Sequence, residues 1–479
     1  MTELRPRRIG RWGGTASGPG AAGRVVPRRP GSGGSARVTR RAILGGLSAA
    51  GVAGTLGACT RGAPGQPSSA AELDQAVTLD FLTRQPYEAA FEEAIARFRA
   101  RFPKAQVQRD HQANNTAFNQ KLETLVAAGT PPDVAFAVGS TYHGQAARGF
   151  FEDLTPYLGR DKTLDVNDFV PFWLEAGKFR GKLYFFPFDP GTTVVFWNKR
   201  HFAAAGLKAP DVTQAMTWPQ FQELARQLTR VPPAVPESQA QFGCELMTDR
   251  LWYLLPWQMG VEVFDKDFRQ CRLNDPQAID AIQFAADLRG KHGVWRPATY
   301  EGPATSFVGG SVAMSHTGYW EAGPRRERMQ PAGEDFDVMP LPTFPGRPRL
   351  TIGWGSGNAM VAGGSHKAMA WEFVKHLSDR EVYEILLERG VMQPVRKSQA
   401  NSPAYRKHTP PHSFDVPLDD TRTARTPPFH PAMGELPAMM VEGLAEAFAG
   451  KSAVKPLVEQ LVPLVNAKLA EFNARYPAG

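Results

Sequence analysis

The sequence is short of the residues and motifs that most metal and catalytic sites require. Only 3 of its 479 residues are cysteines, and no C-x-x-C pair occurs. The motifs H-E-x-x-H and G-x-S-x-G are also absent, and the 10 histidines show no ligand spacing. We therefore expect no metal, no cofactor and no catalytic residues. A carboxylate pair for glycoside hydrolysis stays open, because the sequence does not report how far apart two carboxylates lie.

Net positive charge is absent outside the first 58 residues. Those residues hold ten arginines and one acid, Glu3, and so carry a net charge of +9. The net charge of the whole sequence is +8, so the remaining residues carry −1. A nucleic-acid-binding domain normally carries a basic surface of its own. We therefore expect no nucleic-acid partner.

No apolar run reaches the roughly twenty residues of a membrane-spanning helix. The most apolar candidate, residues 42–58, is about seventeen residues long and rich in glycine, which suits a removable export signal. The preceding Arg40 and Arg41 resemble a twin-arginine export motif, and Leu56-Gly57-Ala58-Cys59 resembles a lipobox. We predict an export signal over 1–58, lipidation of Cys59 and a tether over 59–76. An ordinary signal peptide with a chance cysteine, or a true start further downstream, is the alternative.

The leader predicts an exported chain, held by its lipid at the outer face of the cytoplasmic membrane or in the periplasm. Two further cysteines, Cys244 and Cys271, would then lie in an oxidising compartment. A disulfide and two free buried thiols both remain open, since spacing does not decide between them.

Beyond the leader, strand and helix patterns alternate, as in α/β proteins with parallel sheets. Ligands of such sheets bind beyond the carboxyl ends of the strands, which indicates the loops 83–87, 140–143 and 189–192. Around the last loop we predict a strand over 183–188, a turn at Asp189-Pro190-Gly191 and a second strand over 192–197.

Several motifs occur in the order found in one family of binding proteins. They are Gly129-Thr130-Pro131-Pro132-Asp133-Val134; Gly181, Lys182, Tyr184 and Pro187; Trp197-Asn198-Lys199; Phe307 to Met314; Gly318-Tyr319-Trp320; Ala370-Trp371-Glu372-Phe373; and Gly390 to Arg396. Together they resemble extracellular solute-binding protein family 1 of ATP-binding-cassette importers, the sugar-binding group that includes maltose-binding protein. The resemblance covers roughly residues 77–479.

This resemblance implies an α/β, two-lobed periplasmic-binding-protein-like fold of type II. Each lobe would be a mainly parallel sheet flanked by helices, and a multi-strand hinge would join the lobes. We expect lobe 1 over 77–192 plus 355–400 and lobe 2 over 193–354 plus 401–479. The implied function is capture of a sugar or oligosaccharide by a monomer and its delivery to the permease subunits of an importer. An exported glycan hydrolase is the alternative.

A sugar has an apolar C–H face and a rim of hydroxyl groups, so its site needs flat aromatic surfaces and fixed hydrogen-bonding groups. For each aromatic residue, packing in the core is the competing interpretation. The candidate aromatic residues are Tyr87, Tyr142, Trp252, Tyr319, Trp320 and Trp354, and the candidate polar residues are Gln85, Asp189, Gln393 and Arg396.

Overall fold

The computed structural model describes residues 70–231, 240–297, 306–333, 335–390, 392–428 and 430–476. The predicted export signal with Arg40 and Arg41, the lipidation site Cys59 and most of the tether lie outside the described residues. All the described residues belong to one compact unit. Within these ranges, no helix has both the length and the apolar character needed to cross a membrane.

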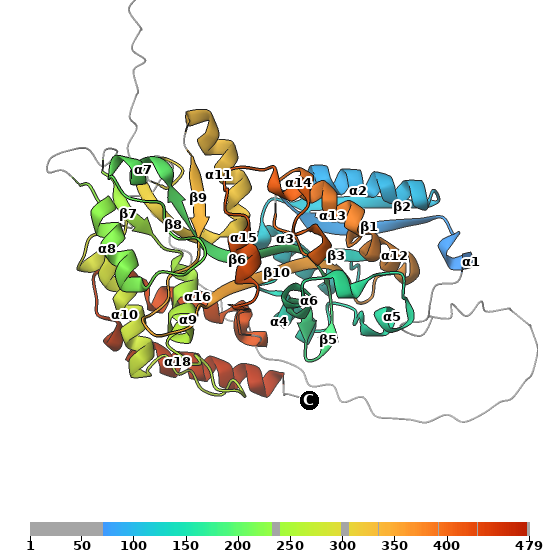
Figure 1. Ribbon diagram of the computed structural model, residues 1–479. Helices are drawn as coiled ribbons and strands as arrows, with labels where there is room; N and C mark the ends of the chain where they lie inside the picture. The colour runs from blue at the N-terminus through green and yellow to red at the C-terminus, as the bar shows by residue number, and fades with distance from the viewer. Residues whose placement is uncertain are drawn as a thin grey trace, which may run out of the picture. The chain divides into compact units, whose positions relative to one another are not determined.

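Helices and short strands alternate along the described chain (Figure 1). The strands are β1 (Val77–Arg84), β2 (Ala105–Gln112), β3 (Val134–Ala137), β4 (Lys178–Phe179), β5 (Lys182–Leu183), β6 (Phe186–Asn198), β7 (Phe242–Glu245), β8 (Val312–Gly318), β9 (Phe336–Met339), β10 (Thr351–Met360) and β11 (Ala424–Arg425). The helices are α1 (Ala70–Leu73), α2 (Glu88–Arg101), α3 (Asn115–Ala127), α4 (Tyr142–Ala147), α5 (Thr155–Arg160), α6 (Pro171–Ala176), α7 (Lys199–Ala204), α8 (Trp218–Leu228), α9 (Thr248–Gln258), α10 (Pro276–Gly290), α11 (Ala322–Met329), α12 (Lys367–Leu377), α13 (Arg380–Glu388), α14 (Pro403–Arg406), α15 (Asp415–Asp420), α16 (Leu436–Gly443), α17 (Ala445–Phe448) and α18 (Val454–Arg475).

Two strands, β6 and β10, connect the two ends of the main sheet, whose order is β2-β1-β3-β10-β6-β8-β7. The strands β1 to β3 lie on one side of this pair and β7 to β9 on the other (Figure 1). Parallel pairs build the outer parts, β1 with β2 and β3 at one end and β7 with β8 at the other. The strands β6 and β10 run antiparallel to each other. Both groups of strands therefore depend on the same two crossing strands.

The predicted turn at Asp189-Pro190-Gly191 is wrong, because β6 runs through it without a break. In the described part of the sheet, β6 pairs with β10 alone as far as Thr192, and its pairing with β8 begins at Thr193. Pro190 therefore lies where one edge of the strand is open. A proline is tolerated at such an edge, since its missing N–H removes no ladder hydrogen bond there.

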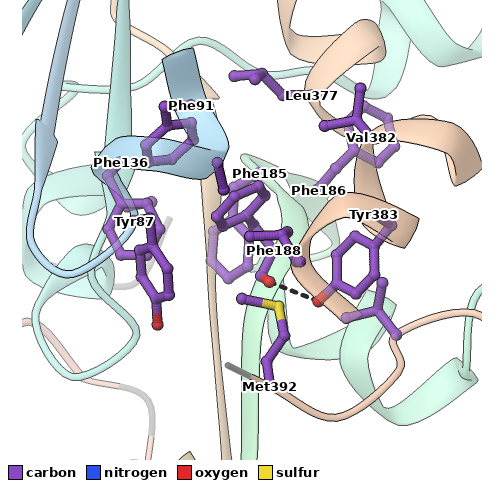
Figure 2. Packing of buried hydrophobic residues seen from close by; sticks show 14 of the residues in the cluster. Tyr87, Phe91, Phe136, Phe185, Phe186, Phe188, Leu377, Val382, Tyr383 and Met392 are labelled. Carbon is purple, nitrogen blue, oxygen red and sulfur yellow. Dashed lines mark hydrogen bonds between the residues drawn. The ribbon is translucent and has the colours of Figure 1, made fainter. Parts of the chain in front are cut away.

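The buried apolar side chains form two clusters. The first lies around β1 to β3 and the start of β6, where the rings of Phe91 and Phe188 stack with centroids 4.9 Å apart (Figure 2). In the same view the Tyr383 hydroxyl donates to the backbone oxygen of Phe188 at 2.5 Å. The second cluster lies around α9, α10 and α18. Side chains alternate along β6, so that Phe196 joins the first cluster and Trp197 the second.

Helix starts follow local capping chemistry. The side chain of Thr217 accepts a hydrogen bond from the backbone N–H of Gln220, and the Gln220 side chain accepts from the Thr217 N–H, which forms a capping box at α8. At α10, Asp275 caps the helix and Pro276 occupies its first position, where a missing N–H costs nothing.

Of the two possibilities for Cys244 and Cys271, the structure has the free thiols, and both are buried. Burial raises the pKa of both thiols, that of Cys271 to about 12. Neither thiol is therefore ionised to any useful extent at neutral pH.

Candidate functional site

One face of the crossing strands carries polar and aromatic side chains from both β6 and β10. The ladder pairs Asp189 with Ser356 and Gly191 with Trp354. Because residues two apart on a strand point to the same side, these four positions share one face. Ser356 is held in place, since its hydroxyl accepts a hydrogen bond from the backbone N–H of Gly139 at 3.0 Å.

The opposite face of the crossing strands is closed by helices. A Cβ atom on Gly353 would lie 2.6 Å from a ring carbon of Phe172, and one on Gly355 would lie 3.1 Å from the Cβ of Ala176, both on α6. The α15 residue Pro417 accepts a hydrogen bond from Thr192 at 3.4 Å. A solute that contacts the crossing strands would therefore meet the face that carries Asp189 and Trp354.

An ion pair lies at the end of this face that is nearest β1. Arg84, the last residue of β1, places Nη2 2.6 Å from Oδ2 of Asp189. Its guanidinium also lies 4.9 Å from the ring centroid of Phe136 and 5.5 Å from that of Tyr87. Burial raises the pKa of Asp189, and the charge of Arg84 lowers it in part. Burial and then the charge of Asp189 raise the pKa of the Tyr87 hydroxyl well above its ordinary value, so this group stays a neutral donor.

Two tryptophans lie on the same face at the side nearest β8. Trp320, directly after β8, is half-buried, and Trp354 on β10 is 9% exposed. Their ring centroids are 5.9 Å apart with the planes at 79°. The Trp320 ring lies against two glycines, since a Cβ on Gly191 or on Gly318 would fall 2.3 Å or 2.1 Å from its atoms. The Arg250 guanidinium is 4.5 Å from the Trp354 ring centroid. Two glycines thus make the space that seats Trp320.

Five of the predicted site residues therefore fall into two groups on or beside this face, and one of them, Tyr87, is 5% exposed with its ring packed in the first cluster. Gln85 and Tyr87 adjoin Arg84, which contacts Asp189, and the exposed Gln85 accepts a hydrogen bond from Arg84 through its backbone oxygen. Trp320 and Trp354 form the second group. Their role in solute binding stays a prediction.

Three predicted aromatic residues are core residues and do not present a ring for stacking. The Tyr142 ring is fully buried, and its hydroxyl donates to the backbone oxygens of Ala176 and Lys178 at 2.6 and 2.8 Å. Trp252 has no exposed surface and packs edge-on against Tyr253. Tyr319 is buried in the first cluster. All three rings are enclosed by side chains distant in sequence, which favours the competing interpretation of core packing, and their role in solute binding stays a prediction.

The last two polar candidates are also enclosed. Gln393 is fully buried, and Arg396 is 3% exposed. Arg396 contacts Asp168 at 3.3 Å, and its guanidinium lies 4.2 Å from the ring centroid of Phe169. Arg396 therefore holds the 165–169 segment, and Gln393 presents no surface in this structure, so the role of both residues in solute binding stays a prediction.

Sequence reasoning missed Arg84, Arg250 and the two glycines under Trp320. Arg84 had a usable signal, because it ends a predicted strand inside the loop 83–87. The sequence held no such signal for Gly191 and Gly318, whose importance depends on a ring brought to them by folding. Among the described residues, no group of three or more His, Cys, Asp or Glu side chains is placed to hold a metal ion.

Comparison with known proteins finds a matching family and related sequences. The profile of the family described as bacterial extracellular solute-binding protein matches residues 83–384. The lactose-binding protein of Rhizobium radiobacter is 24% identical over 343 residues, which cover 67% of this chain and 74% of that protein.

Two solved structures are similar in fold. One is the ABC substrate-binding protein Lmo0181 of Listeria monocytogenes in complex with cycloalternan, with a TM-score of 0.73 at 22% identity. The other is UgpB of Mycobacterium tuberculosis in complex with glycerophosphocholine, with a TM-score of 0.71 at 23% identity. Each comparison covers 82% of this chain and 99% of the other.

The predicted fold is therefore confirmed, an α/β two-lobed periplasmic-binding-protein-like fold of type II with β6 and β10 crossing between the lobes. Neither the family profile nor these relatives support the alternative of a glycan hydrolase. The family match spans more than half of the sequence. The chain belongs to the bacterial extracellular solute-binding protein family.

Proposed function

We propose that this protein captures a sugar or oligosaccharide outside the cytoplasm and delivers it, unaltered, to the permease subunits of an ATP-binding-cassette importer. Its family membership supports solute capture, and the named relative that binds lactose supports a carbohydrate. The proposal also includes a monomer that is exported and held at the membrane by a lipid on Cys59.

The observation that carries this proposal is the pairing of two chemistries on one face of the crossing strands. Trp320 and Trp354 offer ring surface of the kind on which the apolar face of a pyranose stacks. The Arg84–Asp189 pair offers fixed donors and acceptors, which suit sugar hydroxyl groups. Neither group makes a sugar site alone, and together they match both parts of a sugar ring.

The two groups approach the face from different lobes, which gives a reason for the protein to close on its ligand. Arg84 follows β1 of the first lobe, and Trp320 follows β8 of the second. A solute that contacts both has a higher affinity for the closed arrangement than for an open one. Binding would then shift the population toward closure about β6 and β10. The permease would recognise that closed state.

The test is a thermal-shift screen of the full chain against neutral mono- and oligosaccharides, followed by calorimetry. A bound sugar raises the melting temperature because it stabilises the folded state by RT ln(1 + [L]/Kd). Replacing Trp320 by Ala should raise Kd roughly tenfold, since a stacking ring contributes about 0.5–1.5 kcal/mol beyond its buried area. The matched control is Phe472→Ala, which also removes a partly buried ring beside the second cluster.

Sugar binding with an unchanged Kd in Trp320→Ala would refute this site. Chemical change of the sugar during incubation would refute the transport role and favour a hydrolase. For the anchor, the mass of the mature amino terminus in the wild type and in Cys59→Ser tests whether that cysteine carries lipid.

A further inference from the structure

A second feature of lobe 2 is a cavity beyond the carboxyl end of β7. The β7–β8 ladder ends where Glu245 pairs with Ser315, so the edge of β8 is open at His316 and Thr317. The cavity there has a volume of about 510 Å³. Its position is the lobe-2 equivalent of the strand ends that carry Arg84 in lobe 1, which is where ligands of parallel sheets bind.

The described lining of the cavity is cationic. Three arginines, Arg289, Arg296 and Arg325, line it together with one carboxylate, Glu245. Arg296 approaches Glu245 at 3.4 Å and Arg325 approaches it at 4.0 Å, so both contact the same carboxylate. Burial and then the charge of Arg296 lower the pKa of Arg289 to about 10. A second carboxylate, Glu321, is also close enough to Arg325 to act on its pKa, so the described residues place three arginines against two carboxylates. One anion inside the cavity would offset the remaining positive charge of these described residues.

Two buried side chains lining the cavity have polar atoms without a protein partner. Both ring nitrogens of His316 lack a hydrogen-bond partner among the described residues, although the residue is only 2% exposed. Nε and Nη1 of Arg325 also lack a hydrogen-bond partner among the described residues, while its Nη2 donates to the Ser315 hydroxyl at 2.8 Å. Leaving buried polar atoms unpaired is costly, so such atoms in a cavity indicate a ligand or solvent that completes them.

The start of α9 adds a third favourable element. Leu246, Met247 and Thr248 line the cavity, and Met247 at the N-cap offers no side-chain acceptor to the first N–H groups. A helix N-terminus carries a partial positive charge, which stabilises an anion. Arginine matches phosphate and carboxylate oxygens through paired hydrogen bonds.

The cavity adjoins the aromatic group of the candidate site. Thr317, which lines the cavity, and Gly318 end strand β8, and Trp320 follows in the next turn of the chain. Arg250, which lies over Trp354, is also close enough to His316 to lower the pKa of that ring. The end of β8 and Arg250 therefore connect the cavity to the two tryptophans.

We propose that this cavity binds the anionic group of a phosphate- or carboxylate-bearing sugar or polyol whose ring or chain contacts Trp320. This inference rests on the proposed function and narrows its substrate class. Burial keeps His316 neutral at neutral pH by lowering its pKa to about 3, so it offers one donor and one acceptor to a neighbouring hydroxyl group.

The experiment measures the binding of matched sets of neutral and anionic ligands to the full chain, by calorimetry in phosphate-free buffer at constant ionic strength. Each set contains a neutral sugar, its uronate and its 6-phosphate, and the set of polyols contains glycerol and glycerol 3-phosphate. Inorganic phosphate alone is a further ligand. An anionic member should bind at least tenfold tighter than its neutral partner, and the uronate and phosphate arms separate the two anion types.

The variant Arg296→Gln should reduce the preference for the anionic ligand at least fivefold. We choose Arg296 because its side chain is partly exposed, so its replacement is less disruptive to folding than replacement of the more buried Arg325. The matched control is Arg422→Gln, at an arginine that is 80% exposed and remote in sequence. The control should keep the full preference.

Equal or tighter binding of the neutral members would overturn this inference and leave the proposed function standing. Phosphate binding that depends on Arg296, without binding of any sugar or polyol, would support the anion chemistry of the cavity and overturn sugar capture. Failure of both phosphate and every anionic solute to bind would overturn the inference outright.

Discussion

Adding a single methyl group at Gly191 should displace Trp320 and weaken solute binding without a direct change to the ring. The Cβ of Gly191→Ala would lie 2.3 Å from Cε3 of Trp320, and the three nearest atoms all belong to that residue. Ordinary contact begins at 3.4 Å, so the ring must move by about 1 Å. The backbone itself gives no reason for strain, since Gly191 is not among the glycines with positive φ.

The size of the effect follows from this displacement. Overpacking of this kind costs about 1–3 kcal/mol of folding stability, which a protein of this size can absorb. For binding, a ring moved by about 1 Å loses much of its contact with a stacked sugar. We therefore expect Kd to rise by as much as Trp320→Ala raises it, roughly tenfold.

The assay is a double-mutant cycle read by calorimetry. In a Trp320→Ala background, the atoms that clash with the added methyl group are gone and the remaining neighbours lie at 3.5 Å or beyond, so Gly191→Ala should then change neither affinity nor melting temperature appreciably. Gly159→Ala is the matched control, since nothing lies within 4 Å of its added Cβ. If Gly191→Ala weakened binding equally with and without the Trp320 ring, the proposed seat of that ring would be refuted.

Three further predictions follow from buried groups. Arg84→Met removes the charge that lowers the pKa of Asp189, so burial raises that pKa further in the folded variant. Because the folded variant then binds the proton more tightly than the unfolded chain, its loss of stability relative to wild type should grow as pH rises from 4 to 8. Melting curves at several pH values test this, and Arg84→Lys, which keeps the charge, should suppress the trend. Trp252→Phe should lower the free energy of unfolding by about 2 kcal/mol, measured by denaturation, because the ring is buried. It should leave Kd, measured by calorimetry, within twofold, and a larger rise in Kd would indicate that Trp252 stacks on the solute. In a Cys59→Ser chain at pH 8, a thiol reagent should modify neither Cys244 nor Cys271 until denaturant is added, and rapid modification of the native chain would show that they are not buried.

The arrangement of the candidate site was partly predictable because a general rule of parallel sheets applied to it. Loops at the carboxyl ends of predicted strands included Arg84 and Asp189, and the structure pairs these two residues. The same reasoning placed a turn at Asp189-Pro190-Gly191, where β6 is continuous. The turn preference of these three residues is overridden because β6 pairs with β10, which lies more than 160 residues away in the sequence. No local sequence pattern encodes the register of that pairing.

The sequence by itself determined the order of strands and helices and the family, since apolar periodicity and ordered motifs are properties of neighbouring residues. It also supplied the aromatic residues from which a sugar site could be built. Only the tertiary structure decided that Trp320 keeps an accessible ring while Trp252 has none. Exposure depends on which distant side chains close over a ring, and the long-range packing of β6, β8 and β10 fixes that outcome.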